Sequence, residues 1–177
     1  MKLILNLIIG LILSLNIFNT ENGLTEKKSL TNNDKKTTNC IDEHLQVLTD
    51  KELPKIVSVS VTSTLNNYKF NVGVSSPDIG CEQYANWWEI VSEDGDLLYR
   101  RILAHSHVKE QPFIRLGNVK NIKPDQLLIV RAHMNNMGYG IQAYKGSIIN
   151  GFKAIELETN FAKELETQSP QPKICLF

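Results

Sequence analysis

The sequence predicts an all-β fold: a single antiparallel β-sandwich of the immunoglobulin or fibronectin kind, with short flanking helical turns. Two observations carry this prediction. From residue 56 onward, apolar and polar residues alternate with a period of two in short runs, which is the pattern of half-buried strands. Turn-forming residues separate these runs often enough to leave about seven short strands, as in two packed antiparallel sheets. A small β-barrel is the alternative architecture.

The first pair of runs indicates a hairpin. Valines alternate with serine or threonine across 57–62, and a second alternating run returns across 68–74. Between them, Asn66 and Asn67 tolerate the positive φ angles of a tight turn. The two runs are therefore expected to pair in antiparallel fashion.

The second pair of runs indicates a hairpin even more clearly. Residues 86–92 and 97–104 flank the turn 93–96, whose centre is Asp-Gly, a strong signal for a tight turn. Alternation puts Trp87 and Trp88 on opposite faces. One indole is then expected to fill the space between the sheets while the other covers a surface or a loop.

The remaining elements follow from shorter patterns. A nearly continuous apolar run begins at Leu127, and such a run is typical of a strand that lies centrally in a sheet. We expect further strands at 126–134, 141–148 and 152–157, a short helix at 42–53 and a helical turn at 161–166.

The chain is expected to divide into four segments. The apolar run of residues 3–18 follows Lys2, which is typical of a secretory signal peptide, and it is marginal for the roughly 20 apolar residues of a spanning helix. Residues 21–39 are too polar to bury a core, which predicts a disordered linker. We predict a signal peptide or N-terminal membrane anchor at 1–20, a linker at 21–39, the β-sandwich at 40–160 and a C-terminal tail at 161–177. The protein is thus expected to be secreted or periplasmic, or membrane-anchored by residues 3–18 if the segment stays uncleaved.

Charge narrows the classes of partner. The 19 basic and 19 acidic residues balance, and neither sign clusters along one expected face. Nucleic-acid binding requires a basic footprint, so no nucleic-acid partner is expected. Membrane contact is expected only through an uncleaved N-terminal segment, and a glycan, a peptide or another protein stays open as a partner.

Three cysteines occur in a chain that is expected to reach an oxidising compartment, where disulfides form. Cys81 is central and is the expected participant, with Cys40 or Cys175 as its partner. The alternative is that all three stay reduced. A Cys81 thiolate paired with a histidine would suit a hydrolase, but no common hydrolase, P-loop or dinucleotide motif is present. No catalytic residue is assigned, and a non-catalytic role is favoured.

Histidine and methionine concentrate between residues 105 and 137. His105 and His107 are two apart at an expected strand end and therefore project from one face. With His133 they would form the three-imidazole set of an open zinc site, whereas a thioether from Met134 or Met137 would favour cuprous copper. The alternative is an exposed strand end with methionines as packing. The predicted metal ligands are His105, His107, His133 and Met137, with copper or zinc as the candidate metal.

Aromatic and arginine side chains suggest a recognition surface. The chain otherwise prefers lysine, yet three of its four arginines lie within 100–115, and arginine suits contact with a carboxylate or an aromatic ring. The alternative is an Arg–Glu ladder across the second hairpin, with Glu89 against Arg100 or Arg101. The candidate ligand-binding residues are Tyr84, Trp87, Tyr99, Arg100, Arg101 and Arg115.

Together these patterns predict an exported, non-catalytic binding or accessory protein of unidentified ligand, with copper or zinc binding as its most specific form. One alternative is a secreted hydrolase that uses Cys81 or a bound metal. Another is an adhesion or assembly module that works through aromatic loops and a sheet edge.

Overall fold

A computed structural model of the chain describes residues 53–63 and 67–176. The expected signal segment, the linker, Cys40 and the expected helix at 42–53, apart from Leu53, lie outside the described residues. Within the described ranges, no helix is long and apolar enough to cross a membrane.

The described residues form strands that are all paired antiparallel, followed by a short 3-10 helix. The strands are β1 (Lys55–Ser63), β2 (Tyr68–Ser75), β3 (Ala85–Ser92), β4 (Leu97–Ile102), β5 (Phe113–Val119), β6 (Leu128–Met134), β7 (Gly138–Tyr139), β8 (Gln142–Ser147) and β9 (Gly151–Glu156), and the 3-10 helix is η1 (Lys163–Thr167).

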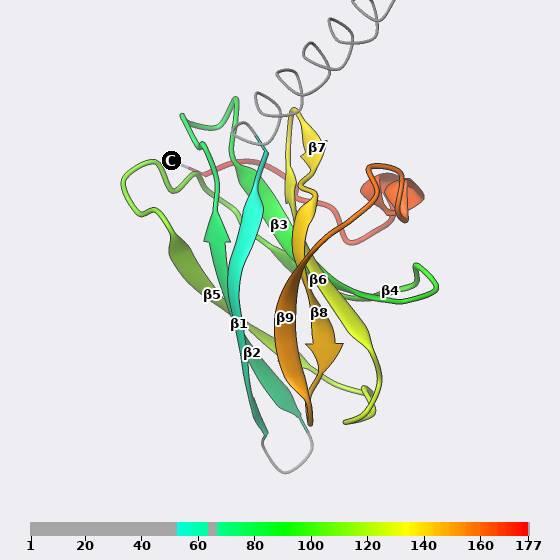
Figure 1. Cartoon of the computed structure of the whole chain (residues 1–177). Coiled ribbons are helices and arrows are strands. Elements are labelled where there is room, and N and C mark those ends of the chain that lie inside the picture. The colour runs from blue at the N-terminus through cyan, green and yellow to red at the C-terminus, as the bar shows by residue number, and fades with distance from the viewer. Residues whose placement is uncertain (1–52, 64–66, 177) are drawn as a thin grey trace, which may run out of the picture.

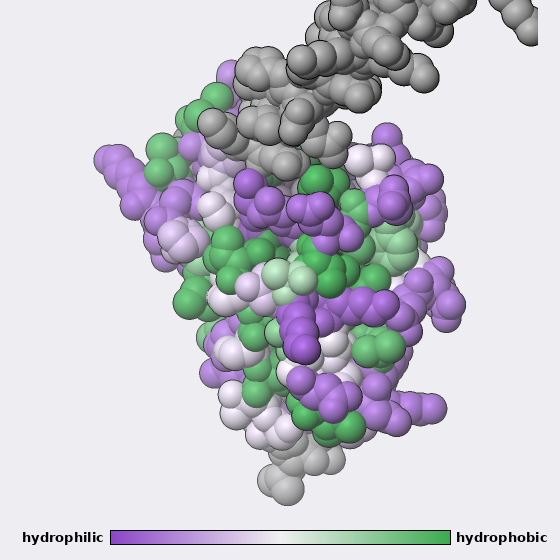
Figure 2. All heavy atoms as spheres, viewed as in Figure 1, coloured by the Kyte–Doolittle hydropathy of each residue, from purple (hydrophilic) through white to green (hydrophobic). Residues whose placement is uncertain are grey.

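Two open sheets pack face to face (Figure 1), and Figure 2 shows the heavy atoms in the same view, coloured by hydropathy. The smaller has the order β1-β2-β5, and the larger has the order β4-β3-β6-β8-β9, with the short β7 paired to β6. Neither order closes on itself, so the predicted β-sandwich is confirmed and the barrel alternative is not formed. The finer immunoglobulin or fibronectin assignment stays a prediction.

Both predicted hairpins are present. In β1–β2, Val59 pairs with Val72 and Val61 with Phe70, while the expected turn residue Asn66 lies outside the described residues. In β3–β4 the turn closes through a hydrogen bond from the backbone N–H of Ser92 to the carbonyl of Asp96, and its glycine adopts a φ of 92°. The strands from 126, 141 and 152 are also confirmed as β6, β8 and β9 with shifted ends, and the helical turn expected at 161–166 is η1.

One long strand, β5, was not predicted. Its inward-facing positions include Arg115 and Gly117, and these residues interrupt the alternation that marks a strand. Gly117 is required by packing, because a Cβ there would lie 2.5 Å from the Cη2 atom of the Trp88 indole. The indole therefore lies directly against the β5 backbone, in the space between the sheets where one of the two tryptophans was expected.

The core between the sheets is apolar and continuous. Alternate residues of β2, β3 and β6 face it, as period-two geometry requires. Its fully buried members include Phe70, Val72, Val74, Trp88, Ile90, Leu128 and Val130.

The outer face of the larger sheet carries a buried ionic cluster. Glu89 on β3 accepts hydrogen bonds from Arg100 Nε at 2.7 Å and from Arg131 Nε at 2.9 Å, and all three side chains are fully buried. This geometry confirms the alternative in which Glu89 pairs with Arg100. The guanidinium groups also donate to backbone carbonyls of the C-terminal segment, at Phe161, Ala162, Leu165, Gln168 and Pro170.

The C-terminal segment, residues 157–176, consequently lies against the sheet. Leu165 of η1 is buried, and η1 occupies the side of the larger sheet that faces away from β1-β2-β5 (Figure 1). The chain then crosses the end of the sandwich, where Cys175 bonds to Cys81. Every residue of β3 except Ser92 is buried for this reason, since one face meets the core and the other meets this segment.

Candidate functional site

The histidine loop, residues 103–112, joins β4 to β5 and is held in place through its backbone. Strand β4 ends at Ile102, so His105 and His107 lie in this loop rather than on the strand. The backbone N–H of His107 donates to Asp78 Oδ2 at 2.7 Å, and its carbonyl accepts from Gln111 Nε2 at 3.1 Å. Neither anchor could be predicted from the sequence, because Asp78 lies in an irregular turn and Gln111 belongs to no recognisable pattern.

The ring of His107 is packed between two other rings. Its centroid lies 3.8 Å from that of Phe113, in a stacked geometry, and 4.5 Å from that of His105. His107 is 4% exposed, whereas His105 is exposed. The structure therefore brings together the two imidazoles that the His-Ser-His spacing placed together.

The ring nitrogens of His107 lack hydrogen-bond partners. Of the six buried side-chain polar atoms without a partner among the described residues, three are Ser106 Oγ, His107 Nδ1 and His107 Nε2. The nearest carboxylate oxygen, Asp78 Oδ2, lies 3.8 Å from Nδ1, which is too far for a hydrogen bond. A buried polar atom without a partner costs about 1–3 kcal/mol, so this concentration in one loop marks a place where a ligand would recover free energy.

The electrostatics keep this ring neutral. Burial lowers the pKa of His107 to about 4, and the positive charge of Arg115 adds to the effect. Neutral imidazole is the form that binds metal ions. Two cavities adjoin the loop, one of about 320 Å³ beside His107 and one of about 550 Å³ beside His105 and Cys81.

His133 is placed elsewhere. It lies on the outer face of β6, stacked on Trp87 at 3.7 Å, with Nδ1 2.7 Å from Asn86 Oδ1 and Nε2 3.0 Å from Glu166 Oε1. Both nitrogens are thus engaged, and the expected convergence with the histidine loop is not formed. Burial lowers the pKa of His133 to about 4 as well.

The other predicted metal ligands do not complete a site. Met134 is buried, and Met137 is 44% exposed in the β6–β7 turn. Across residues 53–63 and 67–176, no group of three or more His, Cys, Asp or Glu side chains is arranged to hold a metal ion. Whether His105 and His107 bind an ion as a pair stays a prediction.

The predicted recognition surface is largely buried. Tyr84 is 4% exposed, Trp87 is 2% exposed and Arg100 belongs to the ionic cluster, so these three cannot form an exposed platform. Trp87 is covered because the C-terminal segment packs on its face of the sheet. Arg101 remains exposed and donates to the Leu116 carbonyl. The other two residues, Tyr99 and Arg115, are partly exposed, with Tyr99 packed on Trp88 and Arg115 paired with Glu110.

The disulfide shows which cysteine pairs with Cys81. Cys81 bonds to Cys175, one of the two partners expected for it, and Cys40 lies outside the described residues. A disulfide sulfur is not a nucleophile, so the hydrolase that would use a Cys81 thiolate is ruled out in this state.

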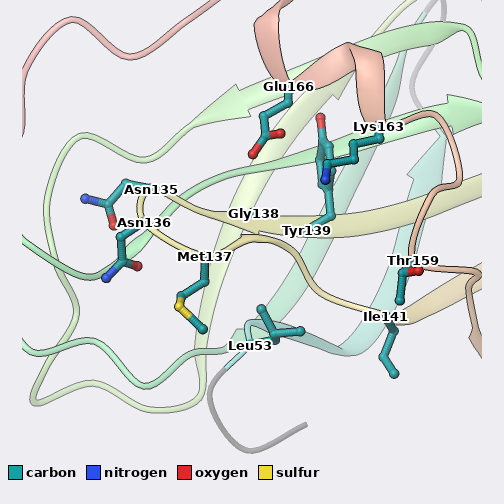
Figure 3. Close-up of a pocket in the computed structure, with 10 residues that line it drawn as sticks. All are labelled: Leu53, Asn135, Asn136, Met137, Gly138, Tyr139, Ile141, Thr159, Lys163 and Glu166. Atoms are coloured by element: carbon teal, nitrogen blue, oxygen red, sulfur yellow. The ribbon is translucent and has the colours of Figure 1, made fainter. Parts of the chain in front are cut away.

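A third cavity, of about 420 Å³, lies beside the β6–β7 turn (Figure 3). Residues 135–139 form one wall and the C-terminal segment forms the other. Glu166, which contacts His133, points toward this cavity. Neither Glu166 nor Lys163 was predicted as a site residue, because the C-terminal tail was not expected to pack on the sheet.

Comparisons with known proteins give limited similarity. No family model matches the chain. Over 75 residues the chain is 36% identical to a "Putative lipoprotein" of Halomicrobium mukohataei, a stretch that covers 42% of this chain and 37% of that protein.

Two solved structures are weakly similar to this chain. Hypothetical protein PH1083 from Pyrococcus horikoshii OT3 is 17% identical, with a TM-score of 0.36 over 61% of this chain and 88% of that one. A superoxide reductase (neelaredoxin) from Ignicoccus hospitalis is 16% identical, with a TM-score of 0.36 over 65% of this chain and 87% of that one. Similarity at this level carries no argument about the function of this chain.

Proposed function

We propose that this chain is an exported accessory protein that binds copper or zinc through His105 and His107 and performs no catalysis of its own. The export is supported by the apolar N-terminal run, by the Cys81–Cys175 disulfide and by the relative described as a lipoprotein. The apolar N-terminal run is compatible with a secreted or periplasmic protein if it is cleaved, and with a protein anchored by residues 3–18 if it is not.

The observation that supports metal binding best is the buried His107 ring whose two nitrogens have no partner, beside the exposed ring of His105. A neutral imidazole is a ligand for both zinc and copper. The pair supplies two protein donors, and solvent or a second molecule would supply the rest. Such an open coordination sphere suits a protein that carries or transfers an ion.

Metal analysis of the purified chain tests this proposal. After incubation with Zn²⁺ or Cu⁺ and removal of excess metal, we expect a stoichiometric ion on the parent chain. The double variant His105→Ala/His107→Ala is expected to lose it. His44→Ala is the matched control, because it removes a histidine outside the loop and should leave the metal content unchanged.

A second variant distinguishes a site made by His105 and His107 alone from a site that also uses His133. His133→Asn is expected to retain the ion, since both nitrogens of His133 are engaged by Asn86 and Glu166. Equal metal content in the parent and in the His105→Ala/His107→Ala variant would contradict the proposed site. Cell fractionation with an antibody against the chain tests the export.

A further inference from the structure

The cavity beside the β6–β7 turn combines both signs of charge with an apolar wall. Lys163 and Glu166 are three residues apart on η1, and side chains at this spacing in a 3-10 helix lie on the same side. Figure 3 shows both side chains entering the cavity region from the C-terminal segment. Met137, Ile141 and Leu53 contribute the apolar part of the lining.

The two charged groups retain capacity for a ligand. Lys163 makes no ion pair within the described part of the chain. Glu166 uses Oε1 to contact His133, which leaves Oε2 without a described partner, and its side chain is 37% exposed. The cavity therefore offers one cationic donor and one anionic acceptor.

The walls are fixed by the fold. The turn lies close to η1 because residue 138 is a glycine with a φ of 86°, and a Cβ at this position would lie 3.3 Å from Glu166 Oε1. On the other side, Arg100 holds η1 to the sheet through the carbonyl of Leu165. A preformed cavity of about 420 Å³ falls within the usual size of small-molecule sites, roughly 300–1,000 Å³.

We propose that this cavity binds a small zwitterion with an apolar side chain, the class to which free amino acids such as leucine belong. The ligand carboxylate pairs with the Lys163 ammonium group, and the ligand ammonium group pairs with Glu166. The apolar side chain contacts Met137 and Ile141, where burial of apolar surface contributes to affinity. The site is separate from the histidine loop and does not depend on metal binding.

Isothermal titration calorimetry of the full chain with three matched compounds tests this assignment. L-leucine carries both charges, N-acetyl-L-leucine carries only the carboxylate and L-leucinamide carries only the ammonium group. Loss of one charge-assisted hydrogen bond costs about 1.5–3 kcal/mol, so we expect each single-charge compound to bind at least about tenfold more weakly than leucine.

Two variants test which charged group of leucine each protein side chain binds. Lys163→Ala is expected to weaken leucine binding about tenfold and to leave leucinamide binding unchanged, because leucinamide has no carboxylate for Lys163. Glu166→Gln should weaken leucine binding and leave N-acetyl-leucine binding unchanged. Lys153→Ala is the matched control, since this exposed lysine lies on β9 away from the cavity.

Some outcomes would overturn the proposal. These are the absence of leucine binding, an equal loss for all three compounds in the Lys163→Ala variant, or the same loss in the Lys153→Ala control. Binding of trileucine without binding of leucine would also overturn it, because the site would then recognise a peptide rather than a free amino acid. Urea unfolding of each variant identifies any loss that comes from a changed fold.

Discussion

At the scale of single residues, Glu89 is the centre of the buried ionic cluster. It is fully buried and accepts hydrogen bonds from Arg100 and Arg131, so one carboxylate pairs with two guanidinium groups. Carbonyl oxygens of the C-terminal segment accept further hydrogen bonds from both guanidinium groups, and the Tyr139 hydroxyl accepts one from Arg100. A buried charge is tolerated only with such partners, which makes this cluster sensitive to the loss of any one member.

Glu89→Gln is therefore expected to destabilise the protein strongly. The amide removes the negative charge and leaves two buried cations, and breaking a buried ion pair in this way costs about 3–5 kcal/mol. Urea unfolding of the parent and the variant measures the difference in free energy of unfolding.

Glu93→Gln is the matched control. Glu93 pairs with Lys145 at the surface, with both side chains more than a third exposed, and such a pair contributes about 0–1 kcal/mol. A small effect of Glu89→Gln, no larger than that of the control, would mean that the ionic cluster does not hold the segment on the sheet.

His133 gives a prediction about pH. Its pKa in the folded protein is about 4, below the ordinary value of 6.5, because burial disfavours the charged ring. The unfolded chain therefore binds a proton at a higher pH than the folded chain does, and stability falls as pH falls from 6.5 to 4. One pKa unit corresponds to about 1.4 kcal/mol, so His133 alone lowers the free energy of unfolding by up to roughly 3 kcal/mol at pH 4.

Unfolding curves recorded between pH 7 and pH 4 measure this slope, and NMR titration of the His133 ring measures the pKa directly. His133→Gln should flatten the slope, and His107, whose pKa is also about 4, contributes to the part that remains. An unchanged slope in the variant would assign the whole effect to other groups.

At the scale of elements, the contact between β3 and β5 depends on the absence of a side chain. Gly117→Ala places a methyl group 2.5 Å from the Trp88 ring and 2.8 Å from the Tyr99 ring. The Trp88 ring lies in the core and the Tyr99 ring packs against it, so the two sheets must move apart, at a cost of about 1–3 kcal/mol. Thermal or urea unfolding measures the cost.

A double-mutant cycle with Trp88→Phe identifies the cause. The smaller ring removes the atoms nearest to the new methyl group, so Gly117→Ala is expected to cost less in the Trp88→Phe background than in the parent. Equal costs in the two backgrounds would place the strain elsewhere.

The elements that the sequence predicted are those whose signals are local. Period-two alternation identified β1 and β2, and the Asp-Gly turn identified the β3–β4 hairpin. Strand β5 was missed because Gly117 and Arg115 face inward for reasons of packing that only the facing sheet supplies. Propensity and alternation describe one strand at a time, whereas β5 is determined by its partner.

In the candidate sites too, contacts between residues close in sequence were predicted and contacts between distant residues were not. The spacing of His105 and His107 predicted that the two rings lie together, and they do. Residue spacing does not predict that His133 points to the outer face, against Glu166, because that contact joins residues 33 apart. Glu166 itself belongs to a segment that is bound through its backbone carbonyls, and carbonyls leave no pattern in the sequence.

At the scale of the whole molecule, the C-terminal segment links parts of the fold that are far apart in the sequence. It covers the outer face of the larger sheet, supplies two charged residues to the cavity beside the β6–β7 turn and ends near the histidine loop. The backbone N–H of Leu176 donates to the carbonyl of Ala104 at 2.6 Å. One segment thus connects both candidate sites, and its attachment rests on the arginine contacts and on the disulfide.

The disulfide is expected to contribute stability mainly by restricting the unfolded chain. Cys81 and Cys175 are 94 residues apart, and closing a loop of this length restricts the unfolded ensemble by about 4–5 kcal/mol in the chain-entropy model. The double variant Cys81→Ser/Cys175→Ser should lose about 2–5 kcal/mol in urea unfolding and remain folded, because Arg100 and Arg131 still bind the segment. The parent in a thiol reductant should show the same loss.

Cys40→Ser is the control and is expected to unfold like the parent. If Cys40→Ser instead lost as much stability as the double variant, Cys40 would belong to the stabilising bridge, and the C-terminal segment would depend on the arginines alone.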